Sequence, residues 1–314
     1  MPKLEKPATT TEVEFIEDPW VDPEPIEETP KPVKKTAKAK PQVNSLFLPL
    51  TETREFLRVL YWGREGSGKT TDALTLANLG KIVVVNAEGG LKKNTLIKRG
   101  VNVDNVVLYP HPGQPITHEG LDEVYRTIKA DLENDPNSWV GVVFDSATDI
   151  VQALVDAVSN DRIAKAKMRG ANIDQFDQFF TDRGDYGTMS KMFRDLLRKF
   201  RDLQAHFIVT ALERRDVDED TGKVAYGPAV TPGIQNDLLG YVDVVLHTKE
   251  ADEDIPVYRA LTKKAGKFRT KDRLDLLPRV LVNPTAERII KYINEELTES
   301  TDPDQTVLDV KTTG

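Results

Sequence analysis

The feature that most constrains this chain is the segment from Phe56 to Thr71, which reads FLRVLYWGREGSGKTT. An apolar run leads into a glycine-rich turn, and Lys-Thr-Thr then opens a segment of helix-forming residues. The turn matches every fixed position of the phosphate-loop pattern G-x-x-x-x-G-K-[ST]. The alternative is a glycine-rich turn without a ligand. The pattern and its flanks favour a strand, a loop whose backbone N–H groups surround a phosphate, and a helix that begins at that phosphate.

The residue types of the turn explain how it would bind a nucleotide. Glycines permit backbone conformations that side chains forbid, so successive N–H groups can point inward. We expect Lys69 to neutralise the β- and γ-phosphates and the Thr70 hydroxyl to bind Mg²⁺. The predicted nucleotide-binding residues are Gly63, Arg64, Glu65, Gly66, Ser67, Gly68, Lys69, Thr70 and Thr71.

Composition limits the remaining chemistry. The 314 residues suggest one large domain with tails, and the absence of cysteine excludes disulfides, thiolate metal sites and cysteine nucleophiles. The net charge of −8 argues against a wholly basic nucleic-acid coat, although a local basic groove is compatible with it. Because we find neither a membrane-spanning apolar run nor a secretory signal, we expect no membrane association and a cytoplasmic location.

The two ends of the chain differ from its centre. Residues 1–45 are rich in proline and charge, so we expect a disordered tail. An alternative is a partner-binding arm that uses Phe15, Ile16 and Trp20 as anchors, for example on a single-strand-binding or replication protein. We expect the folded domain at 46–297 and a polar C-terminal tail at 298–314.

The centre of the chain alternates between strand and helix patterns. Expected strands span residues 56–62, 81–86, 106–109, 139–144, 205–212, 242–247 and 257–262. Expected helices span residues 72–79, 119–132, 147–158, 189–203, 233–239 and 287–297, with polar loops at 159–186 and 213–232. This alternation predicts an α/β fold with a mainly parallel sheet, helices on both faces, and a ligand at the carboxyl ends of the strands.

Two carboxylates follow strands that we expect near the phosphate loop. Asp145 ends the apolar run 139–144, where its carboxylate can bind Mg²⁺ opposite Thr70; the alternative is a helix cap. Glu88 follows the strand 81–86, where it can act as general base toward an attacking water; the alternative is a solvated turn residue. We predict a metal-binding role for Asp145 and a catalytic role for Glu88.

These motifs together resemble the core of RecA-type ATPases. In that family a catalytic glutamate ends the strand after the phosphate-loop helix, as Glu88 does. The later segment GKFRTKDR, residues 266–273, is similar to the Lys-x-Arg element of DnaB-type relatives, which reaches the γ-phosphate of a neighbouring subunit. The resemblance implies ATP as the nucleotide, trans-acting roles for Lys271 and Arg273, and a ring or filament of identical subunits. The alternative for these two residues is a basic surface turn.

Residues 50–285 also resemble compact phage-encoded RecA-like ATPases, which include Sak-type single-strand annealing proteins and are described as AAA-domain ATP-binding proteins. The shared segments are Asn-Ala-Glu-Gly-Gly at 86–90, Asp-Tyr-Gly at 185–187 and Thr-Lys-Asp-Arg at 270–273. The resemblance implies a Mg²⁺-dependent ATPase that acts on single-stranded DNA in recombination or annealing, in a bacterial host cytoplasm. Alternatives are a helicase-like motor, a nucleotide-gated adaptor and, with less support, a small-molecule kinase.

The same resemblance indicates where DNA would bind and where the chain departs from the family. The matching DNA-binding loops are 159–186 and 213–232. Their basic and aromatic residues are Arg162, Lys165, Lys167, Arg169, Arg214, Arg215, Lys223, Phe176, Phe179, Phe180 and Tyr226. Both loops also carry acidic residues, so solvated loops are the alternative. The γ-phosphate-sensing glutamine of the family is missing, and Thr210 or Glu213 is the expected substitute.

Overall fold

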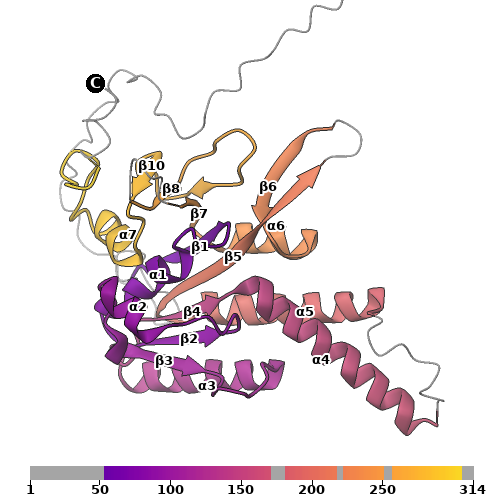
Figure 1. Cartoon of the computed structure of the whole chain (residues 1–314). Helices are drawn as coiled ribbons and strands as arrows, with labels where there is room; N and C mark the ends of the chain where they lie inside the picture. Colours follow the sequence, from indigo (N-terminus) through magenta and orange to yellow (C-terminus); the bar gives the residue numbers. More distant parts are fainter. Residues whose placement is uncertain (1–52, 171–180, 218–221, 251–256, 306–314) are drawn as a thin grey trace, which may run out of the picture.

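The computed structural model describes residues 53–170, 181–217, 222–250 and 257–305. The N-terminal tail and the three aromatic residues Phe176, Phe179 and Phe180 lie outside these ranges. One sheet runs through the centre of the molecule in the order β10-β8-β7-β1-β5-β4-β2-β3, with β6 and β9 attached to β5 and β7 (Figure 1). The phosphate-loop strand β1 therefore lies inside the sheet.

The middle of the sheet is parallel and one side of it is antiparallel. The parallel strands are β3 (Val106–Tyr109), β2 (Ile82–Asn86), β4 (Gly141–Asp145), β5 (His206–Val217), β1 (Arg58–Gly63) and β7 (Val244–Lys249). The antiparallel additions are β6 (Val224–Pro228), β8 (Arg259–Leu261), β9 (Lys271–Asp272) and β10 (Val280–Val282). The predicted mainly parallel sheet is confirmed.

Helices cover both faces of this sheet, as the sequence pattern predicts (Figure 1). One face carries α1 (Lys69–Leu74), the 3-10 helix η2 (Thr75–Asn78), α2 (Lys93–Lys98), the 3-10 helix η3 (Val103–Asn105) and α7 (Ala286–Ile293). The other face carries α3 (His118–Asn134), α4 (Ala147–Met168), α5 (Arg183–Arg201) and α6 (Pro232–Tyr241).

Each face of the sheet carries a hydrophobic core beneath its helices, and the side chains of β1 point alternately into the two cores. Leu60 and Trp62 point into the core beneath α3–α6, whereas Val59 and Tyr61 point into the core beneath α1 and α7. All four side chains are fully buried. Successive strand residues face opposite sides of a sheet, so a continuous apolar run marks a strand that is covered on both faces. This burial fixes the register of the strand that leads into the phosphate loop.

The first predicted loop, 159–186, is wrong over much of its described part. Helix α4 continues to Met168, and α5 already begins at Arg183. The two helices are joined where Arg162 of α4 donates to both carboxylate oxygens of Asp185 at 3.0 Å. Asp185 also receives the Ser159 hydroxyl at 3.0 Å. The polar sequence therefore belongs to two helices whose joined ends project from the sheet (Figure 1), and polar contacts between Ser159, Arg162 and Asp185 connect them.

The second predicted loop, 213–232, is also wrong in part. Strand β5 continues to Val217 and pairs with β6 in an antiparallel hairpin, with Glu213 opposite Pro228 and Val217 opposite Val224. A charged strand of this kind is stable outside the core because its partner strand satisfies the backbone groups, while the side chains remain in water. The hairpin extends β5 beyond the sheet (Figure 1).

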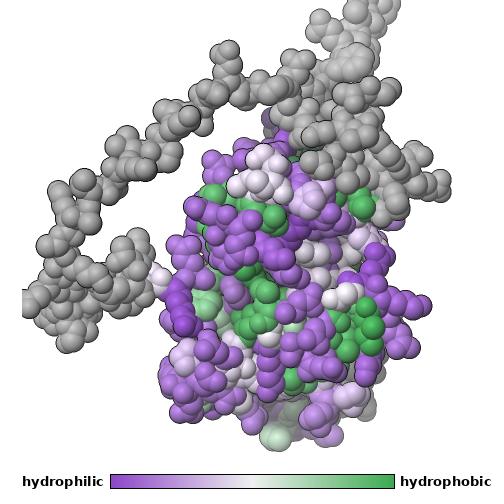
Figure 2. Space-filling model, turned by 90° about the vertical axis from the view of Figure 1, so that its left-hand side faces the viewer, coloured by the Kyte–Doolittle hydropathy of each residue, from purple (hydrophilic) through white to green (hydrophobic). Residues whose placement is uncertain are grey.

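The molecular face shown in Figure 2 is mostly polar. The face shown in Figure 2 carries hydrophobic residues in separate patches between hydrophilic ones. In the described ranges, no helix combines the length and the apolar composition needed to cross a membrane. Separate apolar side chains of this kind are ordinary on a protein surface.

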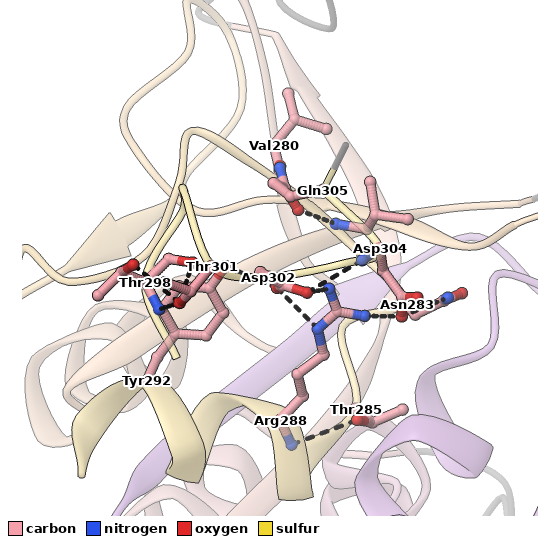
Figure 3. Close-up of polar contacts among 11 residues, drawn as sticks. Val280, Asn283, Thr285, Arg288, Tyr292, Thr298, Thr301, Asp302, Asp304 and Gln305 are labelled. Atoms are coloured by element: carbon pink, nitrogen blue, oxygen red, sulfur yellow. Dashed lines mark hydrogen bonds and ion pairs between the residues drawn. The ribbon is translucent and has the colours of Figure 1, made fainter. Parts of the chain in front are cut away.

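The C-terminal segment 298–305 packs on the domain, although we expected it to belong to a polar tail. Arg288 of α7 binds both Asp302 and Asp304, and the Tyr292 hydroxyl donates to Asp302 at 2.7 Å (Figure 3). Asp302 is 1% exposed. Burial opposes its ionisation, but the hydrogen bonds from Arg288 and Tyr292 outweigh burial and lower the pKa of Asp302. The side-chain amide of Gln305 bonds the backbone of the last strand, β10.

This cluster gives a stability prediction. Replacing Arg288 with Met removes the charge that compensates the buried Asp302 carboxylate, which should cost about 3–5 kcal/mol of unfolding free energy. Replacing Lys291 with Met is the matched control on the same helix, because its pair with Glu287 is partly exposed and is expected to contribute at most about 1 kcal/mol. Urea denaturation of both variants measures the difference. Equal losses of unfolding free energy would contradict the view that the buried Arg288–Asp302 pair stabilises the domain.

Candidate nucleotide-binding site

The phosphate loop joins β1 to α1 at the carboxyl end of the sheet. Gly68 has φ +86°, a conformation that disfavours side chains, and it directly precedes the helix. A Cβ at Gly63 would lie 2.5 Å from the backbone oxygen of Thr248, so only glycine fits between β1 and β7 there. The Ser67 hydroxyl fastens the loop through Thr248 Oγ1 at 2.7 Å. The predicted loop therefore has the backbone shape that its glycines indicate.

Lys69 folds back onto the loop. Its ammonium donates to the backbone oxygens of Gly63 at 3.0 Å and Arg64 at 2.6 Å, and the residue is 7% exposed. Burial lowers the pKa of Lys69, while the nearby carboxylates of Glu88 and Asp145 oppose that shift. A phosphate entering the loop would offer this ammonium a stronger, charged partner than the two carbonyl oxygens.

Asp145 connects the loop to the sheet. At the end of β4, its Oδ1 accepts the Thr70 hydroxyl at 2.9 Å and the Thr210 hydroxyl at 2.6 Å. The residue is 2% exposed. Burial raises the pKa of Asp145, whereas the two hydroxyl groups and Lys69 favour the ionised form. The helix cap that we considered as the alternative for Asp145 belongs to Ser146, whose hydroxyl accepts from the Asp149 N–H.

Glu88 is placed beside Asp145 by the backbone. The Asp145 carbonyl oxygen accepts the N–H groups of Ala87 at 2.7 Å and Glu88 at 3.2 Å, because β2 and β4 are neighbours in the sheet. The Glu88 side chain is exposed at the edge of a cleft that also contains Thr70 and Asp145. Partial desolvation and then the carboxylates of Asp145 and Asp149 raise the pKa of Glu88. The structure thus brings together Lys69, Thr70, Glu88 and Asp145.

These side chains suit a nucleotide with a hard divalent cation. Mg²⁺ prefers hydroxyl and carboxylate oxygens, and it is commonly held by one or two protein groups together with substrate phosphates. Thr70 and Asp145 supply such oxygens 2.9 Å apart. Among the described residues, no group of three or more His, Asp or Glu side chains could hold a metal ion without help. The donor set therefore fits Mg²⁺ that arrives with a nucleotide.

The other side of the loop contacts the base of the β5–β6 hairpin. Glu213 accepts from His247 Nε2 at 2.8 Å and from Arg64 Nε at 3.4 Å. The hydrogen bond from His247 lowers the pKa of Glu213, and burial lowers the pKa of His247, so an ionised carboxylate faces a neutral imidazole at neutral pH. Both expected substitutes for the missing glutamine are therefore near the loop: Thr210 is hydrogen-bonded to Asp145, and Glu213 is hydrogen-bonded to Arg64.

Lys271 and Arg273 are not brought to the loop of their own chain. Strand β9 pairs with the first residues of β7, Val244 and Val245, whereas the phosphate loop follows the β1 residue that lies opposite Thr248. The Lys271 ammonium donates to the Leu239 carbonyl oxygen at 2.5 Å, and Arg273 pairs with Asp243 at 3.2 Å. Their trans-acting role stays a prediction.

The basic residues expected to contact DNA differ in how far they are already engaged. Arg162 is held by Asp185, and Lys165 pairs with Asp161 at 2.5 Å. Lys167 and Arg169 are exposed at the far end of α4. On the hairpin, Arg214 pairs with Asp216 at 2.7 Å, Arg215 is exposed, Lys223 lies next to β6, and Tyr226 stacks on Phe268 with centroids 5.4 Å apart.

Sequence reasoning missed several residues around the loop. His247 and Thr248 lie near the end of β7, the strand next to β1, and Arg99 and Tyr258 border the same cleft as Lys69 and Glu88. Strand order makes His247 and Thr248 neighbours of the loop, and this order cannot be read from one sequence. The apolar run 242–247 followed by threonine was the available signal for those two, whereas nothing in the sequence pairs Arg99 with Tyr258.

The fold and the site together define an α/β P-loop domain with a mainly parallel sheet and helices on both faces, as the sequence predicts. A family model described as AAA domain matches residues 55–274, and the chain belongs to that family. Among solved structures, the crystal structure of the RadB recombinase is similar, with 17% sequence identity and a TM-score of 0.42 over 67% of this chain and 84% of that one. Among curated proteins, none matches.

The loop geometry predicts that two of its glycines differ in how much stability is lost when each is replaced by alanine. Gly66 and Gly68 both have positive φ, so alanine at either position should cost about 1–2 kcal/mol of stability. A Cβ at Gly68 would also lie 2.9 Å from the Tyr258 ring, whereas a Cβ at Gly66 meets nothing within 4 Å. Thermal denaturation should therefore show a lower Tm for Gly68→Ala than for Gly66→Ala. Equal Tm values would show that the Tyr258 ring does not press on the loop.

Proposed function

We propose that this protein binds and hydrolyses ATP with Mg²⁺ and that nucleotide state controls its self-assembly and its binding to single-stranded DNA, in phage recombination or annealing. The observation that carries the ATPase proposal is the convergence of Lys69, Thr70, Glu88 and Asp145 at one edge of the sheet. The loop backbone and Lys69 would bind the β- and γ-phosphates, and Thr70 and Asp145 would hold the cation.

The hydrolytic step needs a base beside the γ-phosphate. Glu88 would accept a proton from water as the water oxygen bonds to the γ-phosphorus and the bond from that phosphorus to the bridging oxygen of ADP breaks. Its raised pKa makes the carboxylate a better proton acceptor than an ordinary glutamate. Bound Mg²⁺ would stabilise the charge that develops on the phosphate oxygens. In its protonated form, Lys69 would add positive charge at the same oxygens.

The DNA-binding part of the proposal is supported by two projecting elements. Lys167 lies in the last turn of helix α4, Arg169 directly follows the helix, and the β5–β6 hairpin carries Arg215, all three with exposed side chains. The hairpin starts at Glu213, which contacts the phosphate loop through Arg64. A change in the loop could therefore reach the hairpin through one ion pair. Exposed arginine and lysine side chains are the usual contacts to nucleic-acid phosphates.

The assembly part of the proposal concerns Lys271 and Arg273. Arg273 is the stronger candidate for contacting a neighbour's γ-phosphate, because its side chain is 59% exposed. Lys271 would first have to leave the Leu239 carbonyl oxygen, and burial lowers its pKa. An arginine supplied by a second subunit would stabilise charge in the transition state.

ATP hydrolysis with and without single-stranded DNA tests this function. We expect the wild type to hydrolyse ATP faster when DNA is present, and Lys69→Ala to be inactive in both conditions. The double variant Lys167→Ala/Arg169→Ala should keep its DNA-free rate but lose most of the stimulation. If both residues contact DNA phosphates, the slope of log DNA affinity against log salt concentration should be smaller in magnitude by about 1.4 in the double variant than in the wild type.

The matched control is Lys129→Ala/Lys263→Ala, which removes two exposed cations from other parts of the surface. This control should be stimulated like the wild type. Hydrolysis that ignores DNA, together with no retention of DNA in a filter assay, would remove the DNA part of the proposal. The nucleotide-gated adaptor would then be favoured, and deletion of residues 1–45 would test whether a protein partner is lost.

A further inference from the structure

We infer that the acidic segment at residues 12–28 docks, within the same chain, in an arginine-lined groove at the end of β1 opposite the phosphate loop. The groove has a volume of about 530 Å³ and lies among the start of β1, the ends of α5 and α6, and the residues that flank β7 and β9. We call it the arginine groove. Its lining includes Arg58, Arg201, Asp202, Tyr241, Asp243 and Arg273.

The carboxylates of the arginine groove balance only part of its positive charge. Arg201 pairs with Asp202 at 2.6 Å, and Arg273 pairs with Asp243 at 3.2 Å. Arg58 instead donates from Nε and Nη2 to the Arg201 carbonyl oxygen at 2.9 Å and 2.7 Å, and in the described part of the chain it forms no ion pair. A backbone oxygen satisfies a guanidinium N–H without neutralising its charge. A carboxylate that enters the groove would therefore gain a stronger, charge-assisted contact.

A tyrosine held by two arginines adds a stacking surface to the arginine groove. The guanidinium carbons of Arg201 and Arg198 lie 5.1 Å and 5.6 Å from the centroid of the Tyr241 ring. Arg198 also donates to the Tyr241 hydroxyl at 2.9 Å. Because the Arg198 side chain is exposed, its outer side is open to a further aromatic ring. The groove thus combines positive charge with a surface for stacking.

The sequence of residues 12–28 complements this groove. Eight of the seventeen residues are Asp or Glu, and none is Lys or Arg. Trp20 has Asp18 and Asp22 two residues away on either side. Alternate residues of an extended backbone share one face, so an extended docked segment would present Trp20 together with both carboxylates. Tryptophan and arginine are also the residues that most often dominate the binding energy of an interface.

The chain enters the folded domain beside the arginine groove. Residues 54–58 line a smaller hollow of about 280 Å³, and Arg58 and Asp243 line both this hollow and the groove. Residues 29–52 separate the acidic segment from the first described residue. Fully extended, this tether would span about 80 Å, so its length does not limit docking. A tethered segment also binds at a high effective concentration, so individually weak contacts are sufficient.

Docking has a consequence for assembly. Because Arg273 lines the same groove, the docked segment would cover it until the segment leaves. That consequence rests on the proposed trans-acting role of Arg273, whereas docking itself does not depend on ATP hydrolysis. A chain that fails to hydrolyse ATP would refute the proposed function and leave the docking to be judged by its own test.

Acrylamide quenching of tryptophan fluorescence in the full chain provides that test. The chain has three tryptophans, and Trp62 and Trp139 are only 0% and 8% exposed, so changes in quenching report on Trp20. At low salt we expect Trp20 to be less quenched than in a free peptide of residues 12–28. The Debye length falls from about 10 Å at 0.1 M salt to about 3 Å at 1 M, so high salt should remove most of this protection.

Charge reversal on either side identifies the groove as the docking site. Arg198→Glu/Arg201→Glu should raise the quenching of Trp20 to that of the free peptide. Asp18→Lys/Asp22→Lys should do the same from outside the described domain. Combining the two double variants should restore part of the protection, which a variant that merely disturbs the fold cannot do. Lys129→Glu/Lys165→Glu, which reverses two exposed cations on α3 and α4, is the matched control and should be quenched like the wild type.

Four results would overturn the inference. The first is wild-type Trp20 that is as accessible as in the free peptide. The second is protection that survives Arg198→Glu/Arg201→Glu, because the segment would then bind elsewhere, for example on the lysines of residues 31–40. The third is protection that grows with protein concentration, which would assign the groove to the segment of a second copy. The fourth is weaker DNA binding by the groove variant with Trp20 accessible in both proteins, which would make the groove a nucleic-acid site.

Discussion

The buried carboxylate of Asp145 is the interaction on which the site depends. Its Oδ1 accepts hydroxyl groups from Thr70 of the phosphate-loop helix and Thr210 of β5, and its backbone oxygen accepts the N–H of Glu88. One residue therefore fixes the loop, the neighbouring strand and the turn that carries the predicted base. Burying a carboxylate is costly unless it is hydrogen-bonded, and here the compensating partners are parts of the site itself.

Strand order explains why Asp145 can contact the phosphate-loop helix, β5 and the turn that carries Glu88. Parallel strands place their carboxyl ends at one edge, and β1, β5, β4 and β2 are consecutive in the sheet. At this edge lie the phosphate loop after β1, the start of the β5–β6 hairpin, Asp145 at the end of β4 and Glu88 after β2. Helices on both faces bury the strands and hold their register. The antiparallel strands β8 and β10 extend the sheet beyond β7, and the ion pair between Arg288 and Asp302 holds the C-terminal segment on that side. The packing that stabilises the fold thus also sets the geometry of the site.

Much of this architecture could be predicted because the signals were local. The apolar runs of β1 and β4 and the glycines of the loop each describe one element. The closeness of Asp145 and Glu88 could also be predicted, because parallel strands place their carboxyl ends at the same edge of a sheet. The errors came from segments in which polar residues form regular structure. Arg162 and Asp185 are 23 residues apart, so their pairing across α4 and α5 is invisible in a local pattern. The same holds for Arg99 with Tyr258 and for Arg288 with Asp302, which depend on contacts between distant parts of the chain.

The most direct test of the central claim is an equilibrium titration of ATP, with and without Mg²⁺, for the wild type and Asp145→Asn. Asparagine keeps the size of the side chain and can still accept from Thr70 and Thr210, but it removes the charge. The account predicts that Mg²⁺ strengthens ATP binding in the wild type and strengthens it much less in the variant. An equal gain in both proteins, or wild-type binding that is indifferent to Mg²⁺, would contradict the role assigned to Asp145.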